Sequence, residues 1–174
     1  MGLDSIELVI DIEKFFGIQI PDREAEKIYS VQLMADAVAR LSGVVSGSIL
    51  LRNRVFALIT DALKKSGYTG MPVSVLHSLD AALSLTDNEQ WQVFSSALGM
   101  EVPKPSKEEW PTLSFGLLTD AVGMANYRSL IDGSNIISRY EVYIAVGGIT
   151  VDKTGVSYYE IAPEKSFTDD LGID

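Results

Sequence analysis

The chain has 174 residues, of which 47% are hydrophobic, and a formal net charge of −10. This length suits one medium domain or two small ones, and the apolar fraction is sufficient for a folded core. The acidic balance argues against a nucleic-acid binder, which needs a basic face, and favours a protein that meets basic partner surfaces. Because the chain has no cysteine and one histidine, His77, thiolate nucleophiles and zinc–thiolate sites are excluded and no metal site is expected.

No apolar run approaches the roughly 18 residues that a membrane-spanning helix needs, and no basic-then-apolar leader opens the chain. The sequence therefore predicts no membrane span and a cytoplasmic location.

The first predicted element is a helix over residues 6–16, where apolar side chains recur at helical spacing and charged ones fall on the opposite face. Gly17 ends this helix, and a short apolar segment, 18–21, follows. Ser30 is a candidate N-cap for a second helix over 31–41. Within that helix, Asp36 and Arg40 have the i, i+4 spacing of an ion pair.

Residues 42–48 are rich in glycine and serine and predict a linker. An amphipathic helix is expected over 55–65. Thr86 and Glu89 form a capping-box pattern, which predicts a helix over about 87–98. Thr112 precedes a further helical run that extends to residue 122.

Residues 123–135 are a second candidate linker. The apolar segment that follows, about 136–153, has helical spacing, but Gly147 and Gly148 disfavour a helix and its β-branched residues would also suit a strand. The tail from residue 160 is predicted to be a loop with an acidic end.

A weak internal repeat appears when the sequence is shifted by 82 positions. Residues 17–21 then lie over 99–103, and with two inserted residues 36–38 meet 120–122. This order of matching segments predicts a duplication. The alternative is that any two short helices that end in glycine look alike.

Residues 7–21, ELVIDIEKFFGIQIP, resemble without a gap the second helix and following loop of acyl and peptidyl carrier proteins. Residues 22–41 are similar to the third element and final helix of that family. The tail, residues 159–174, resembles the end of the family's long first loop, which reads DLGxDS. The chain therefore resembles a carrier protein that is circularly permuted, or split, at its own attachment point.

The resemblance implies an all-α fold of two small four-helix bundles, and it favours a helix over 136–153. One carrier-like domain would combine residues 1–43 with 124–174, and residues 52–122 would form a divergent second one. The first domain could close within one chain, or between chains as a swapped homo-oligomer.

Carrier proteins are not enzymes, and the resemblance implies that this chain tethers acyl or aminoacyl groups as thioesters on a 4′-phosphopantetheine arm. The implied pathways are fatty-acid, polyketide or related biosynthesis. The implied partners are a phosphopantetheinyl transferase and acyl-transferring or condensing enzymes with basic surfaces. The alternative is a pseudo-carrier, a helical interaction module without the arm.

The family carries its arm on a serine at a helix N-terminus, where free N–H groups and the helix dipole favour a phosphodiester. Ser5 matches the local tag GLDSI, but counting back from Pro21 places Gly2 at the attachment position. In the second repeat Ser84 lies over Gly2, and Ser78 is a further candidate. The implied partner-binding carboxylates, which could equally form an ordinary solvated helix face, are Asp4, Glu7, Asp11 and Glu13.

Overall fold

The computed structural model describes the backbone of residues 3–173 and the side chains of residues 5–173. The regular structure in this part of the chain is helical, which confirms the all-α prediction, and its two short backbone pairings are isolated bridges. The chain divides into two compact units. Unit 1 comprises Met1–Ile49 and Tyr127–Asp174, and unit 2 comprises Leu50–Asn126.

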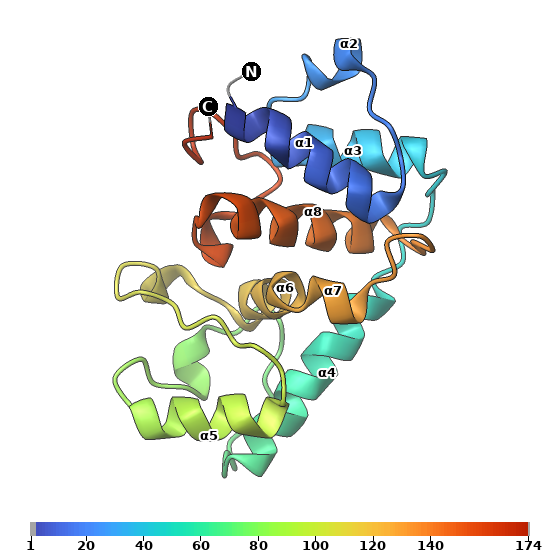
Figure 1. Cartoon of the computed structure of the whole chain (residues 1–174). Coiled ribbons are helices and arrows are strands. Elements are labelled where there is room, and N and C mark those ends of the chain that lie inside the picture. The colour runs from blue at the N-terminus through green and yellow to red at the C-terminus, as the bar shows by residue number, and fades with distance from the viewer. Residues whose placement is uncertain (1–2, 174) are drawn as a thin grey trace. The chain divides into compact units, whose positions relative to one another are not determined.

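Unit 1 is built around a long helix, α8, which contacts both α1 and α3 (Figure 1). Its core is apolar, and the largest fully buried side chains include Leu8, Ile12 and Ile144. α8 is a helix although it contains Gly147 and Gly148, and both glycines are buried. The elements of unit 1 are α1 (Leu3–Phe16), α2 (Asp22–Ala25), α3 (Val31–Leu41), α7 (Tyr127–Leu130), α8 (Arg139–Thr154) and the 3₁₀ turn η3 (Tyr158–Glu160).

The tail of the chain is part of unit 1. Its backbone pairs with the residues that open α3: the N–H of Phe167 donates to the carbonyl of Tyr29 (2.9 Å), and the N–H of Val31 donates to that of Lys165 (3.1 Å). These bonds frame an isolated bridge between Ser30 and Ser166. The tail also buries four apolar side chains in the core, namely Ile161, Phe167, Leu171 and Ile173.

Unit 2 is continuous in sequence, and its first helix, α4, contacts both α5 and α6. The loop before α5 pairs with the start of α6. The N–H of Leu79 donates to the carbonyl of Leu113 (3.2 Å), and the N–H of Phe115 donates to the carbonyl of His77 (2.9 Å). These bonds frame the bridge between Ser78 and Ser114. The elements of unit 2 are α4 (Leu50–Lys65), η1 (Leu79–Ala81), α5 (Asn88–Leu98), η2 (Trp110–Thr112) and α6 (Phe115–Ala125).

Several helix ends follow the predicted chemistry. The Ser30 hydroxyl accepts from the N–H of Leu33 (3.3 Å), which confirms the predicted cap of α3. Gly17 ends α1 in the left-handed conformation (φ 64°), which glycine adopts without the steric cost of a side chain.

Other boundaries differ from the predictions. α4 begins five residues earlier than expected, at Leu50. The cap of α5 is Asp87 rather than Thr86, and α6 follows a Ser114 cap rather than coming directly after Thr112. The predicted second linker was wrong in part, because α6 continues to Ala125 and α7 follows it.

The predicted ion pair between Asp36 and Arg40 does not form. Asp36 instead pairs with Arg139 at the start of α8 (3.0 Å), and Arg40 pairs with Glu24 in α2. Both contacts join α3 to another element. The charged side chains of α3 therefore form tertiary ion pairs and not a pair within the helix. In unit 2 a corresponding pair joins Asp120 of α6 to Arg52 of α4, with two bonds of 3.0 and 3.1 Å.

Candidate functional site

The candidate site is the beginning of α1. Ser5 is the third residue of this helix and its side chain is half-buried. It therefore lies inside the first turn, where backbone N–H groups lack helical partners and the helix dipole favours an anion. Gly2, the alternative attachment position, lies outside the described residues, and so does the side chain of Asp4. The position of Ser5 suits a phosphodiester electrostatically, although the hydroxyl is within the helix rather than before it.

The segment after α1 is held in place by Glu13. The Oε1 atom of Glu13 accepts a hydrogen bond from the backbone N–H of Ile20 (2.6 Å), and Ile20 is buried. Glu13 therefore has a structural task in addition to its predicted place on a docking surface. It fixes the return of the chain beside α1, a contact that the sequence pattern did not reveal.

Glu7 and Asp11 are both ion-paired inside unit 1. The Lys153 ammonium lies 2.6 Å from a carboxylate oxygen of Glu7 and 3.4 Å from one of Asp11, and these contacts raise the pKa of Lys153. Asp11 also lies 3.6 Å from Lys14. Both carboxylates remain partly exposed, at 46% for Glu7 and 41% for Asp11. They are therefore not free docking charges, since a basic partner would have to compete with Lys153.

An apolar and acidic surface covers the side of α1 next to α2. Ile6 and Ile10 are large hydrophobic side chains that are 44% and 39% exposed. They border a hollow of about 380 Å³. We call this surface the acidic face, and its members are Ile6, Val9, Ile10, Glu13, Asp22 and Glu26.

Ser84, the candidate in unit 2, lies four residues before the first residue of α5. The backbone N–H of Ser84 donates to the side chain of Gln90 (2.8 Å), and the amide nitrogen of Gln90 donates to the carbonyl of Ala82 (3.1 Å). The N-terminus of α5 is already capped by the carboxylate of Asp87, which accepts from the N–H of Gln90 (2.8 Å). Ser84 is thus separated from the helix N-terminus, and an anion already occupies that end. Ser78 is exposed and lies in the bridge to Ser114.

The acidic tail makes its own turn through Asp170. One oxygen of Asp170 accepts from the backbone N–H of Ser166 (2.8 Å), and the other lies 3.4 Å from the Lys165 ammonium. The bond from Ser166 is the main cause that holds the pKa of Asp170 below its usual value, against an opposing contribution from desolvation. This turn presents Phe167 and Leu171 to the core.

The lowered pKa makes a pH-dependent contribution to stability. Because the folded state favours the carboxylate, this contribution is present above the unfolded pKa, near pH 4, and is lost as the pH falls through the lower folded pKa. We expect Asp170→Asn to lower the melting temperature at pH 7 but to have little effect below pH 3. Asp169→Asn is the matched control, because the Asp169 carboxylate accepts no hydrogen bond within residues 5–173. Equal effects of the two substitutions at pH 7 would contradict this role for Asp170.

Two further observations concern residues 3–173. No group of three or more histidine, cysteine, aspartate or glutamate side chains there is arranged to hold a metal ion. None of the helices in this range has the length and hydrophobicity needed to cross a bilayer.

The fold and the site describe an all-helical protein with a serine in the first turn of an acidic, amphipathic helix. A stretch of 38 residues is 51% identical to acyl carrier protein 2, mitochondrial, of Arabidopsis thaliana. It covers 22% of this chain and 30% of that protein, so the chain spans under a third of the relative's length. No protein-family profile matches the chain. No solved structure matches it either. The chain thus has a partial, local similarity to an acyl carrier protein.

Proposed function

We propose that unit 1 is a carrier module that tethers acyl or aminoacyl groups and that Ser5 is its attachment residue. The observation that carries this proposal is the local identity to an acyl carrier protein. The position of Ser5 in the first turn of α1 supports it. The module would be a substrate for other enzymes rather than an enzyme itself. The expected cytoplasmic location stays a prediction.

The attachment step follows from the position of the serine. The Ser5 oxygen would form a bond to the β-phosphorus of coenzyme A and give up its proton to a base of the transferase. The P–O bond to adenosine 3′,5′-bisphosphate would break, with the electron pair leaving on that group. The first-turn N–H groups and the dipole of α1 would stabilise the resulting phosphodiester. The bound arm supplies a thiol, which this cysteine-free chain lacks.

We also propose that the two units are copies of one fold with different starting points. In both, the loop after a 16-residue helix (α8 in unit 1, α4 in unit 2) forms an isolated bridge to a serine. That serine, Ser30 in unit 1 and Ser114 in unit 2, caps an 11-residue helix (α3 or α6). In both, an aspartate of that capped helix pairs with an arginine of the 16-residue helix. These correspondences support a duplication with a permuted first copy, in which α1 corresponds to α5.

A second candidate function has one specific observation in its favour. α1 already includes Leu3, so Ser5 does not precede the helix as an attachment serine does in the carrier family. If the register counted from Pro21 applies, Gly2 occupies that position. Unit 1 would then be a pseudo-carrier that kept the acidic face and lost the arm.

The experiment that separates the two functions is intact mass spectrometry after incubation with coenzyme A and a broad-specificity phosphopantetheinyl transferase. If the carrier proposal holds, the native chain gains the mass of one arm and Ser5→Ala abolishes the gain. Ser84→Ala, the matched control, should leave it intact, because Gln90 and Asp87 keep Ser84 away from a free helix end.

A further variant, Gly2→Ser, tests the alternative. No adduct on the native chain together with an adduct on Gly2→Ser would establish the pseudo-carrier. It would also show that the transferase recognises the rest of α1.

A further inference from the structure

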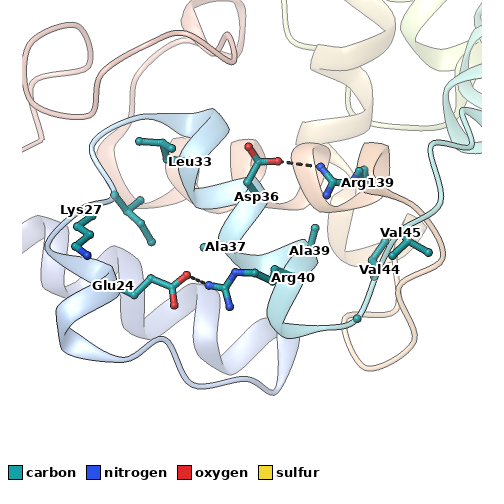
Figure 2. A pocket seen from close by; sticks show the side chains of 12 residues that line it. Glu24, Lys27, Leu33, Asp36, Ala37, Ala39, Arg40, Val44, Val45 and Arg139 are labelled. Atoms are coloured by element: carbon teal, nitrogen blue, oxygen red, sulfur yellow. Dashed lines mark hydrogen bonds and ion pairs between the residues drawn. The ribbon is translucent and has the colours of Figure 1, made fainter.

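A groove with cationic edges runs along the exposed side of α3. Leu33, Asp36, Ala37 and Arg40 have the i, i+3, i+4, i+7 spacing of one helix face, and all four line a hollow of about 710 Å³. Figure 2 shows this face between α2, the segment after α3 and the start of α8. The face extends over about two helical turns, or roughly 10 Å. We call it the cationic groove, and its apolar floor and basic rim comprise Leu33, Ala37, Val44, Val45, Lys27, Arg40 and Arg139.

The rim of the cationic groove keeps positive charge available. Glu24 and Asp36 each pair with one arginine, Arg40 and Arg139 respectively, as the dashed lines in Figure 2 show. The two arginine side chains remain 58% and 52% exposed, and each guanidinium has five N–H donors. Lys27 is exposed and has no ion pair within residues 5–173. The two carboxylates thus orient the guanidinium groups and leave the lysine uncompensated.

The floor of the groove exposes apolar surface at Val45 and, in part, at Leu33, whereas Ala37 and Val44 are buried beneath it. Val45 is 89% exposed, although it is a branched aliphatic side chain in a short segment fixed at both ends. Two backbone hydrogen bonds hold the segment. The N–H of Val44 donates to the carbonyl of Ala39 (2.7 Å), and the N–H of Arg139 donates to the carbonyl of Ser46 (2.9 Å). Because the segment is held, Val45 stays beside the hollow, where an apolar side chain of a partner would cover it.

The acidic face on α1 is complementary to this groove. It presents Ile6 and Ile10, and its Asp22 and Glu26 side chains form no ion pair within residues 5–173. Both surfaces are therefore apolar in the middle, one with uncompensated negative charge and the other with uncompensated positive charge. They are separate hollows, because Glu26 lines one and its neighbour Lys27 lines the other.

We propose that the cationic groove of one copy of this chain binds the acidic face of a second copy. The isoleucines of α1 would contact the floor at Leu33, Ala37 and Val45. Asp22 and Glu26 would pair with rim cations. Since the two surfaces differ, the contact is head-to-tail and each copy keeps one surface open for a further copy. This inference does not rest on a carrier function.

The association is expected to be weak. Each copy carries a net charge of −10, so copies repel one another at long range, and the two surfaces are small. Sedimentation velocity from about 10 μM to about 1 mM covers the range of a transient interface. The native chain should show a mean mass that rises with concentration.

Three variants identify the surfaces. The groove variant Lys27→Glu/Val45→Asp and the face variant Ile6→Gln/Ile10→Gln should each remain monomeric. The control Lys107→Glu/Met71→Asp makes the same change in net charge as the groove variant and also replaces an exposed apolar side chain by aspartate, but in unit 2, and it should associate like the native chain. All substituted side chains are partly or largely exposed, so the fold should persist, which circular dichroism would check.

Mixing the two monomeric variants is the decisive measurement. One supplies an intact acidic face and the other an intact groove, so the mixture should form heterodimers and nothing larger. A native chain that stays monomeric at every concentration would overturn the proposal. So would a groove variant that associates like the native chain, or a mixture without heterodimers. A tail-swapped oligomer would be insensitive to Lys27→Glu/Val45→Asp, so the groove variant distinguishes the two modes of assembly.

Discussion

Deletion of residues 159–174 should unfold unit 1. The deleted segment buries Ile161, Phe167, Leu171 and Ile173, each at most 6% exposed. At about 1.5–3 kcal/mol for each buried side chain, the loss is on the order of 6–12 kcal/mol, comparable with the entire stability of a small domain. The backbone bonds that the tail donates to and accepts from residues 29–32 would be lost as well.

The measurement is an amide NMR spectrum of the shortened chain together with its urea unfolding curve. Signals of unit 1 should collapse to the range of unfolded chains. Unit 2 is continuous in sequence and contains none of the deleted residues, so its signals serve as the internal control. An unchanged unfolding curve would show that residues 3–49 and 127–154 form a stable unit without the tail.

Gly133→Ala should destabilise unit 1 through a clash with the backbone. A Cβ atom at Gly133 would lie 2.9 Å from the carbonyl carbon of Phe15, closer still to its oxygen, and 3.1 Å from its ring. The obstacle is the end of α1, which cannot move like a flexible side chain. Overpacking of this kind costs typically 1–3 kcal/mol, and the clash with backbone places this site at about the upper end.

Gly47→Ala is the matched control. A Cβ atom there would meet no atom within 4 Å, and Gly47 does not have a positive φ angle. The melting temperature should therefore fall for Gly133→Ala and stay nearly constant for Gly47→Ala. Equal melting temperatures would mean that the loop around Gly133 relaxes away from α1 at little cost.

Local chemistry was predictable from the sequence. Ser30 caps a helix because its hydroxyl reaches an N–H three residues later, and Gly17 ends one because it tolerates a positive φ angle; both effects act within a single turn. The helical period also identified α1 and α3, whereas α8 was expected as a helix only from the resemblance, because its glycines and β-branched residues left a strand open. At α5 two adjacent residues could serve as the cap, and the pattern did not indicate that Asp87 would be used instead of Thr86.

Contacts across long separations were not predictable in the same way. Asp36 was expected to pair with Arg40 one turn away, but its partner, Arg139, is 103 residues distant. The start of α4 was missed because an exposed Leu50 stands beside Leu51, which is buried, so the first turn does not show one clear apolar side. At the candidate site, the sequence indicated the charged residues but not their partners, since Lys153 reaches Glu7 only after α8 packs on α1. The cationic groove needs three segments together and has no signature in any one of them.

The interrupted path of unit 1 has a consequence for the order of folding. The Arg52–Asp120 pair of unit 2 spans 68 positions, whereas the Asp36–Arg139 pair of unit 1 spans 103. Contacts between residues distant in sequence require the closure of long loops. The chain loses conformational entropy in this closure before native contacts compensate the loss, and this slows folding. During synthesis, unit 2 therefore has all of its residues available while α1 and α3 still wait for α8 and the tail. In that interval, the apolar sides of α1 and α3 lack α8, which contacts both in the folded unit, and this favours aggregation.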